Sequence, residues 1–230
     1  MFSSRNCDEL HNIKFDNETI EWVKEYKYLG LILTSTMSFA PHIDHVCTQV
    51  SRYTGLFYHL QKSFPRQILM LLYNAFILPH FILHIEIWGS VPDCHLKRII
   101  IKQNKLLRAI LGVVIVQGIP TVHTVDMYKS LRILTVRNLY KLSLFKFMIF
   151  MRQGYLPYFY NILLRPLETD HSYNTRSNVF RHPLITSEVE RRSILHQLVI
   201  LNESILPEMY NNVSVQIAFS RYKKHLLDNQ

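Results

Sequence analysis

The stretch CHLKRIIIKQNKLLRAIL, residues 94–111, followed by Gly112, carries a clear helical pattern in this 230-residue chain. At about 100° per residue, its Leu and Ile side chains, Ile101 excepted, fill one arc of a helix, and its cations fill the opposite arc. Asp93 before it and Gly112 after it are typical of helix ends, so we predict an amphipathic helix over 94–111 with Asp93 as its cap. The five cations are Lys97, Arg98, Lys102, Lys105 and Arg108.

Helical spacing of apolar residues recurs along the chain, and only six glycines interrupt it. Residues 20–34 differ, because β-branched and aromatic residues dominate there and predict extended structure, with Gly30 marking a bulge or a close backbone approach. The expected fold is therefore mainly α-helical with a short β segment near the N-terminus. The other helices are predicted over 41–62, from Pro65 to about Leu78, over 80–88, over 124–131, from a Thr135 cap to about Arg152, over Val189–Leu201 and over Val215–Leu227.

The positive charge is concentrated in one segment. The net charge is +9, and residues 93–152 contain eleven Lys and Arg but only two acidic residues, whereas the rest of the chain is neutral. Five like charges on one helix face repel each other and lack carboxylate partners on that helix, so an external anion would relieve them. A phosphate backbone fits this pattern, and the alternatives are a solubilising surface or docking against acidic lipid.

No catalytic or metal-binding constellation emerges from the acidic, cysteine and histidine residues. Phosphoryl transfer by two metal ions needs clustered carboxylates, and the only adjacent acidic pair is Asp8-Glu9 in a polar N-terminus. The cysteines are far apart, and the histidines near Cys94 are interpreted as structural rather than as metal ligands. We therefore predict no catalytic residue, no metal site and no cofactor in this chain.

The apolar run Ile68–Trp88 has about the length of a membrane span. However, Pro79 interrupts a helix, and Asn74, His84 and Glu86 are costly in hydrocarbon, so we predict short buried helices and no membrane span. The N-terminus lacks a signal-peptide pattern, which predicts an intracellular protein of the nucleus or cytoplasm.

Six short motifs occur in a characteristic order along the chain. In this order the motifs resemble the C-terminal part of non-LTR (LINE-type, jockey-like) retrotransposon reverse transcriptases, and the resemblance runs from near residue 20 to the end. The motifs are Lys27-Tyr28-Leu29-Gly30, Pro41-His42-Ile43, Leu72-Tyr73-Asn74, Leu78-Pro79-His80, Ile85-Glu86-Ile87-Trp88-Gly89 and His171-Ser172-Tyr173-Asn174-Thr175-Arg176-Ser177.

The resemblance implies a fragment of a right-hand polymerase. Residues 1–36 would be the end of the palm, 37–115 a helical thumb-like region and 116–230 a C-terminal helical region. The Lys-Tyr-Leu-Gly segment would be the primer grip, in which Lys27 neutralises phosphate, Tyr28 stacks and Gly30 admits a sugar-phosphate backbone. Leu29 and Leu31 are interpreted as ordinary strand residues entering a core.

The implied activity is RNA-directed DNA polymerase, a nucleotidyltransferase, but the family's catalytic Asp-Asp hairpin would lie before residue 1. Magnesium would belong to that missing palm. This chain would bind RNA template and DNA primer without sequence specificity, would need the missing upstream polymerase domains as partners and would be inactive alone, with no small-molecule substrate. The alternative is a non-catalytic, decayed or repurposed helical interaction protein. Residues 201–207 lack the family's glycine and tryptophan, which predicts an altered C-terminal module.

Overall fold

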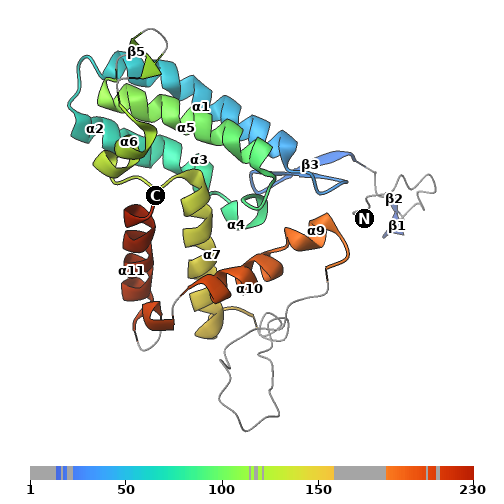
Figure 1. Ribbon diagram of the computed structural model, residues 1–230. Coiled ribbons are helices and arrows are strands. Elements are labelled where there is room, and N and C mark those ends of the chain that lie inside the picture. Colours follow the sequence, from blue (N-terminus) through green and yellow to red (C-terminus); the bar gives the residue numbers. More distant parts are fainter. Residues whose placement is uncertain are drawn as a thin grey trace.

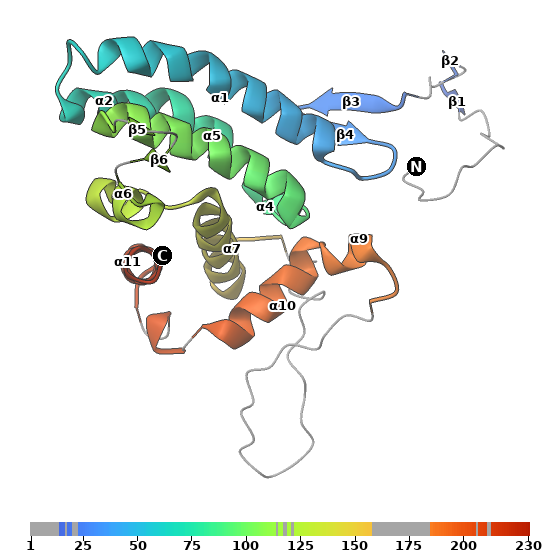
Figure 2. The same ribbon diagram turned by 45° about the horizontal axis from the view of Figure 1, so that its top comes forward.

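Two helices packed side by side, α1 (Ala40–Leu60) and α5 (Asp93–Leu111), form the upper layer of the molecule (Figures 1 and 2). The computed structural model describes residues 14–16, 18–19, 23–113, 115–116, 119–120, 122–157, 185–205, 207–210 and 213–230. The motif His171–Ser177 lies outside these residues. Most of the described residues are helical, so the prediction of a mainly α fold is confirmed.

A bent helical segment underlies α1 and α5. It consists of α2 (Arg66–Leu72), the π-helix η1 (Tyr73–Ile77) and α3 (Leu78–Ile82), which follow one another without a break. Pro79 therefore does not end the helix. It is the second residue of α3, directly after the π-helical turn η1.

The helix predicted over 80–88 is not continuous in the structure, and that prediction was wrong. His84 adopts a left-handed conformation with φ 53°, which separates α3 from α4 (Ile85–Trp88). The indole N–H of Trp88 donates to the carbonyl of Leu83 at 2.7 Å across this break. Among the described residues, no helix is long and apolar enough to cross a membrane.

The lower layer is built around α7 (Val136–Arg152), which α10 (Ile194–Ser204) and α11 (Val215–Asp228) contact. The predicted cap of α7 is confirmed, because the Thr135 side chain accepts a hydrogen bond from Asn138 N at 3.2 Å. The remaining helices are α6 (Thr124–Leu131), α9 (Glu188–Arg191) and the 3₁₀ turn η2 (Pro207–Met209).

Three two-stranded hairpins complete the described structure: β1 (Lys14–Phe15) with β2 (Glu18–Thr19), β3 (Glu25–Tyr28) with β4 (Leu31–Thr34), and β5 (Ile115–Val116) with β6 (Ile119–Pro120). In the β3–β4 hairpin Tyr28 pairs with Leu31. Leu29 (φ 47°) and Gly30 (φ 90°) form its two-residue turn, so Gly30 is a turn residue and not a bulge. Leu31 is buried as predicted, whereas Leu29 is 69% exposed, and its assignment to the core was wrong.

The basic helix α5 follows its predicted course apart from its first residue. Gly112 ends it with φ 64°. Pro92 occupies the cap position, so Asp93 is not the cap but lies in the first turn, where a carboxylate is favoured by the helix dipole. Leu96, Ile99 and Leu106 are among the buried residues of its apolar face.

Gln103 adds a buried polar hub to that face of α5. Its amide nitrogen donates to the Tyr73 hydroxyl at 3.0 Å and to the Leu134 carbonyl at 2.9 Å. Its amide oxygen accepts from the Tyr128 hydroxyl at 3.0 Å and from Val136 N at 3.1 Å. One side chain therefore connects α5 to η1, α6 and the start of α7, and it fixes the basic face relative to both layers.

Candidate nucleic-acid interface

The five predicted cations of α5 form a stripe along its solvent side. Lys97, Arg98 and Lys105 are exposed, and Lys102 and Arg108 are half-buried. At about 1.5 Å of rise per residue, the stripe is roughly 17 Å long. This length corresponds to several phosphates of a nucleic-acid backbone, since phosphates along one strand are spaced about 3.4 Å apart along the axis of a duplex.

One edge of this stripe faces α1 across a surface groove of about 760 Å³. We call it the α1–α5 groove, and its polar lining consists of Asp44, Thr48, Ser51, Arg52, Arg98 and Lys102. Arg52 comes from α1 and was not singled out from the sequence. Arg52 is far from α5 in the sequence, and packing of the two helices brings it into the same groove as Lys102.

Arg98 pairs with a carboxylate on the neighbouring helix. Its guanidinium contacts Asp44 of α1, and the two side chains are 48% and 52% exposed. The expectation that the five cations lack acidic partners concerned carboxylates of α5 itself, and the partner of Arg98 comes from α1 instead. Exposed pairs of this kind contribute about 0–1 kcal/mol, so a phosphate can compete with Asp44 for the guanidinium.

The other polar groups of the α1–α5 groove leave its positive charge in place. The hydroxyls of Thr48 and Ser51 donate to carbonyls of the preceding turn of α1, Asp44 at 2.8 Å and Cys47 at 2.7 Å. Burial raises the pKa of the Cys47 thiol, so it remains protonated and uncharged at neutral pH. Three cations therefore face one carboxylate in the groove.

The predicted primer-grip residues lie on the β3–β4 hairpin. Lys27 and Tyr28 are exposed, and Tyr28 presents 56% of its surface. Gly30 lies close to α3, since a Cβ added to it would come within 3.0 Å of the Leu83 side chain. His84 Nε2 donates to the Leu29 carbonyl at 3.0 Å, which anchors the hairpin tip to the α3–α4 junction.

The structure brings the hairpin close to only one end of the α5 stripe. In Figures 1 and 2 the hairpin lies beyond the N-terminal end of α1, and α5 runs alongside α1. The Arg98–Asp44 contact shows that the N-terminal halves of these two helices are adjacent. Lys105 and Arg108, on the last turns of α5, consequently lie at the end remote from Lys27 and Tyr28.

Two cations of a second basic stripe, on α7, contact other elements of the molecule. Arg137 pairs with Asp93 at 2.7 Å. Arg152 donates to Asn202 Oδ1 at 2.7 Å and lies over the Tyr210 ring at 4.5 Å. These contacts connect α7 to α5 and to the C-terminal elements. The Arg137–Asp93 pair is as exposed as the Arg98–Asp44 pair, so the two contacts of Arg152 are what make this stripe a weaker candidate for an external ligand.

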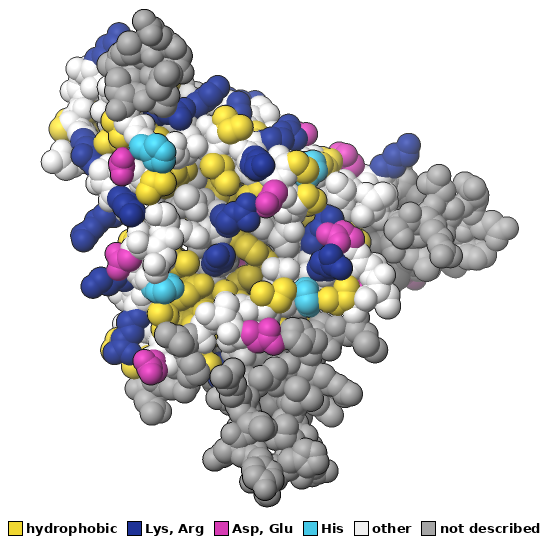
Figure 3. Space-filling view, viewed as in Figure 1, with side chains coloured by type: hydrophobic (Ala, Val, Ile, Leu, Met, Phe, Trp, Pro, Cys, Tyr) yellow, Lys and Arg dark blue, Asp and Glu magenta, His cyan; other side chains and the backbone are white. Residues whose placement is uncertain are grey.

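Another basic surface, separate from the α5 and α7 stripes, combines residues that the sequence pattern did not group. Lys129 and Arg132, near the end of α6, share a pocket with Lys223 and Lys224 of α11. Figure 3 shows Lys and Arg side chains along the left edge of the molecule, over α6 and α11. Lys223 and Lys224 belong to the part of the chain whose charges balance, and only the fold places them beside the basic segment.

The histidines that the sequence suggests as possible metal ligands make other contacts. His80 lies beside Tyr53, with ring centroids 6.0 Å apart, and His84 bonds the hairpin carbonyl. In the part of the chain that the structure describes, no three His, Cys, Asp or Glu side chains gather to hold a metal ion. His42 is buried against Trp88, and burial, reinforced by nearby positive groups, lowers its pKa to about 4.

Comparison with known proteins gives one informative similarity. The chain is 32% identical over 89 residues to the Drosophila melanogaster protein named "Probable RNA-directed DNA polymerase from transposon X-element". The aligned part is 37% of this chain but only 10% of that relative. No family model matches, and no solved structure matches. The similarity supports a relationship to reverse transcriptases of non-LTR elements and does not locate the chain within one.

Proposed function

We propose that this chain is the C-terminal, thumb-containing part of an RNA-directed DNA polymerase of a non-LTR retrotransposon. In that role it binds the template–primer duplex through backbone phosphates and without base specificity. The similarity to the transposon polymerase and the ordered motifs support the family, and the helical layer of α1 and α5 beside a short hairpin is compatible with a thumb attached to the end of a palm.

The α1–α5 groove is the observation that carries the nucleic-acid role. It combines Arg52 from one helix with Arg98 and Lys102 from the next, and it opens to solvent along the exposed stripe of α5. Lys and Arg side chains contact phosphate without reading base identity, and the groove lining contains no Asn or Gln to read an adenine edge.

Catalysis is proposed to reside in another segment of the polymerase. Two-metal phosphoryl transfer needs carboxylates held close together, and the sequence contains no Asp-Asp pair. In this proposal, RNA template, DNA primer and the upstream polymerase domains are the partners of the chain, and the chain contributes affinity for the duplex rather than chemistry.

The salt dependence of binding tests the proposal. The variant Arg52→Gln/Lys102→Gln removes two groove cations and keeps good helix formers. If each cation contacts one phosphate, the slope of log affinity against log salt for an RNA–DNA hybrid should become shallower by about 2 units. Fluorescence anisotropy with two hybrids of unrelated sequence should give the same affinity for both.

A matched control removes two cations elsewhere in the basic segment. Lys141→Gln/Lys146→Gln changes two exposed lysines of α7 that do not line the α1–α5 groove. This control has the same net charge as the groove variant and should keep a slope close to that of the unmodified chain. Equal slopes for the groove variant and the control would reject the groove as an interface and favour the non-catalytic interaction protein.

A further inference from the structure

The basic surface over α6 and α11 contains a pocket of about 570 Å³ between the end of α6 and the outer side of α11. We call it the α6–α11 pocket. Its lining includes Lys129, Arg132, Ser220, Lys223, Lys224 and Asp228, so four cations face one carboxylate. None of these residues belongs to the α1–α5 groove or to the β3–β4 hairpin.

The walls of the pocket are held together by contacts at the C-terminus of the chain. The Gln230 amide donates to the Ile133 carbonyl at 2.8 Å, directly after Arg132. The Asn138 amide lies within 3.4 Å of the Leu226 carbonyl and donates to it. On its inner side α11 buries Tyr222, whose ring lies 4.3 Å from that of Phe145. These contacts fix the spacing of the two basic walls before any ligand arrives.

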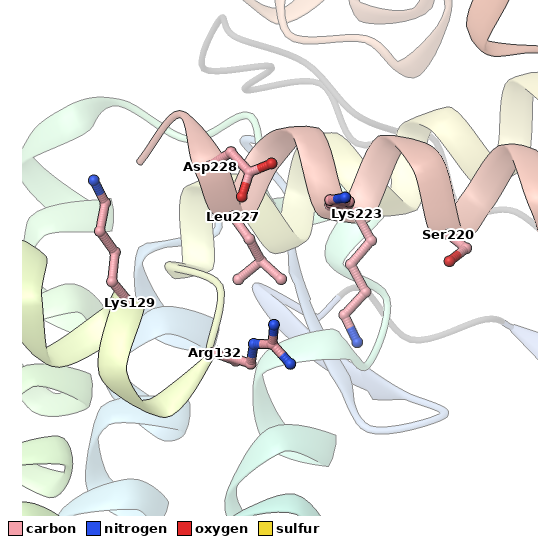
Figure 4. A pocket seen from close by; sticks show the side chains of 7 residues that line it. Lys129, Arg132, Ser220, Lys223, Leu227 and Asp228 are labelled. Atoms are coloured by element: carbon pink, nitrogen blue, oxygen red, sulfur yellow. The ribbon is translucent and has the colours of Figure 1, made fainter.

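Among the described residues, the cations of the pocket have no ion-pair partner. These cations are Lys129, Arg132, Lys223 and Lys224. Figure 4 shows Arg132 and Lys223 extending toward the same space from opposite walls. Such convergence is unfavourable without an anion, because like charges brought together repel each other.

The geometry points to a second phosphate-binding site, in which the α6–α11 pocket holds a backbone phosphate of the bound nucleic acid. Arg132 and Lys223 supply charge-assisted donors from the two walls, and the Ser220 hydroxyl supplies a neutral one. This inference rests on the proposed function, since it concerns the same nucleic-acid ligand. It assigns part of the affinity to α11, the last helix of the chain.

A nucleic acid suits the pocket better than a lipid surface. A helix that docks on a membrane places large apolar side chains beside its cations. In this pocket Leu227 is the apolar lining residue, and it is only partly exposed. The pocket therefore offers charge and hydrogen-bond donors without an apolar face that could enter a bilayer.

Two variants with opposite expected effects test the inference in the full chain. Arg132→Asn/Lys223→Gln removes one cation from each wall, and Asn tolerates the left-handed backbone of position 132 (φ 52°). The salt slope for an RNA–DNA hybrid should become shallower by about 2 units. Asp228→Asn removes the one carboxylate and should tighten binding roughly two- to fivefold, the range of a single exposed charge interaction.

The outcomes separate this inference from the proposed function. If the α1–α5 groove variant changes the slope but both pocket variants behave like the unmodified chain, the pocket inference is overturned and the proposed function stands. If the unmodified chain does not bind the hybrid at low salt, both fall. If the pocket variants change binding to anionic phosphatidylserine vesicles but not to the hybrid, the ligand is a lipid and the inference is also overturned.

Discussion

At the scale of single residues, Gln103 is a buried polar side chain that connects several elements of the fold. It is fully buried and uses its amide to bond Tyr73, Tyr128, Leu134 and Val136. We expect Gln103→Leu to lower the free energy of unfolding by roughly 3–5 kcal/mol, because buried donors and acceptors are left without partners. Urea denaturation followed by circular dichroism measures this loss.

The control for this prediction is Gln67→Leu on α2. Gln67 is exposed, so its replacement should change the free energy of unfolding by less than about 0.5 kcal/mol. A Gln103→Leu variant as stable as Gln67→Leu would show that the hydrogen bonds around Gln103 contribute nothing net to folding.

We expect burial of His42 to lower the folding stability of the protein in mild acid. The side chain is 2% exposed, and burial, then His45, His84 and Lys27, lower its pKa from 6.5 to about 4. Between these values the unfolded chain binds a proton that the folded chain does not bind, so stability falls as pH drops from 6.5 toward 4. A shift of this size corresponds to roughly 3 kcal/mol.

Replacing the imidazole tests the origin of that pH dependence. His42→Phe removes the titrating group and keeps a ring beside Trp88, so the decline in stability below pH 6.5 should become smaller. A residual decline is expected, because burial also lowers the pKa of His45. The control His59→Phe, at an exposed position, should keep the full decline, and the same profile for both variants would contradict the assignment to His42.

At the scale of elements, α7 depends on its N-cap. Thr135 accepts a hydrogen bond from Asn138 N and begins the helix that contacts α4, α5, α10 and α11. Thr135→Ala should lower the free energy of unfolding by about 1 kcal/mol, since the first turn loses its cap. Thr48→Ala, within α1, should be neutral or stabilising in the same thermal melts, because Ala is the better helix former. Equal effects of the two substitutions would contradict a capping role.

At the scale of the whole molecule, we expect no polymerase activity from this chain by itself. Primer extension with an RNA template, dNTPs and magnesium should not exceed a heat-killed control, because the chain has no Asp-Asp pair to position two metal ions. A known reverse transcriptase in the same assay serves as the positive control. Extension above the heat-killed background that disappears on addition of chelator would overturn the proposed division between binding and chemistry.

Local patterns determined the helices because helix formation depends on neighbours three and four residues apart. The helix predicted over 94–111 with a stop at Gly112 matches α5, and the predicted Thr135 cap is found at the start of α7. The same patterns failed where a distant group intervenes. His84 breaks the helix over 80–88 and bonds the Leu29 carbonyl, which is 55 positions away in the chain.

The candidate site likewise combines features that the sequence predicts with features that depend on helix packing. The α5 stripe follows from the sequence, since its five cations share one face of one helix. Helix packing is what pairs Arg98 with Asp44, adds Arg52 to the α1–α5 groove and places Lys223 of α11 in one pocket with Arg132. The physical reason is that charge adds up over space and not along the chain, so packing that joins distant helices sets which charges act together.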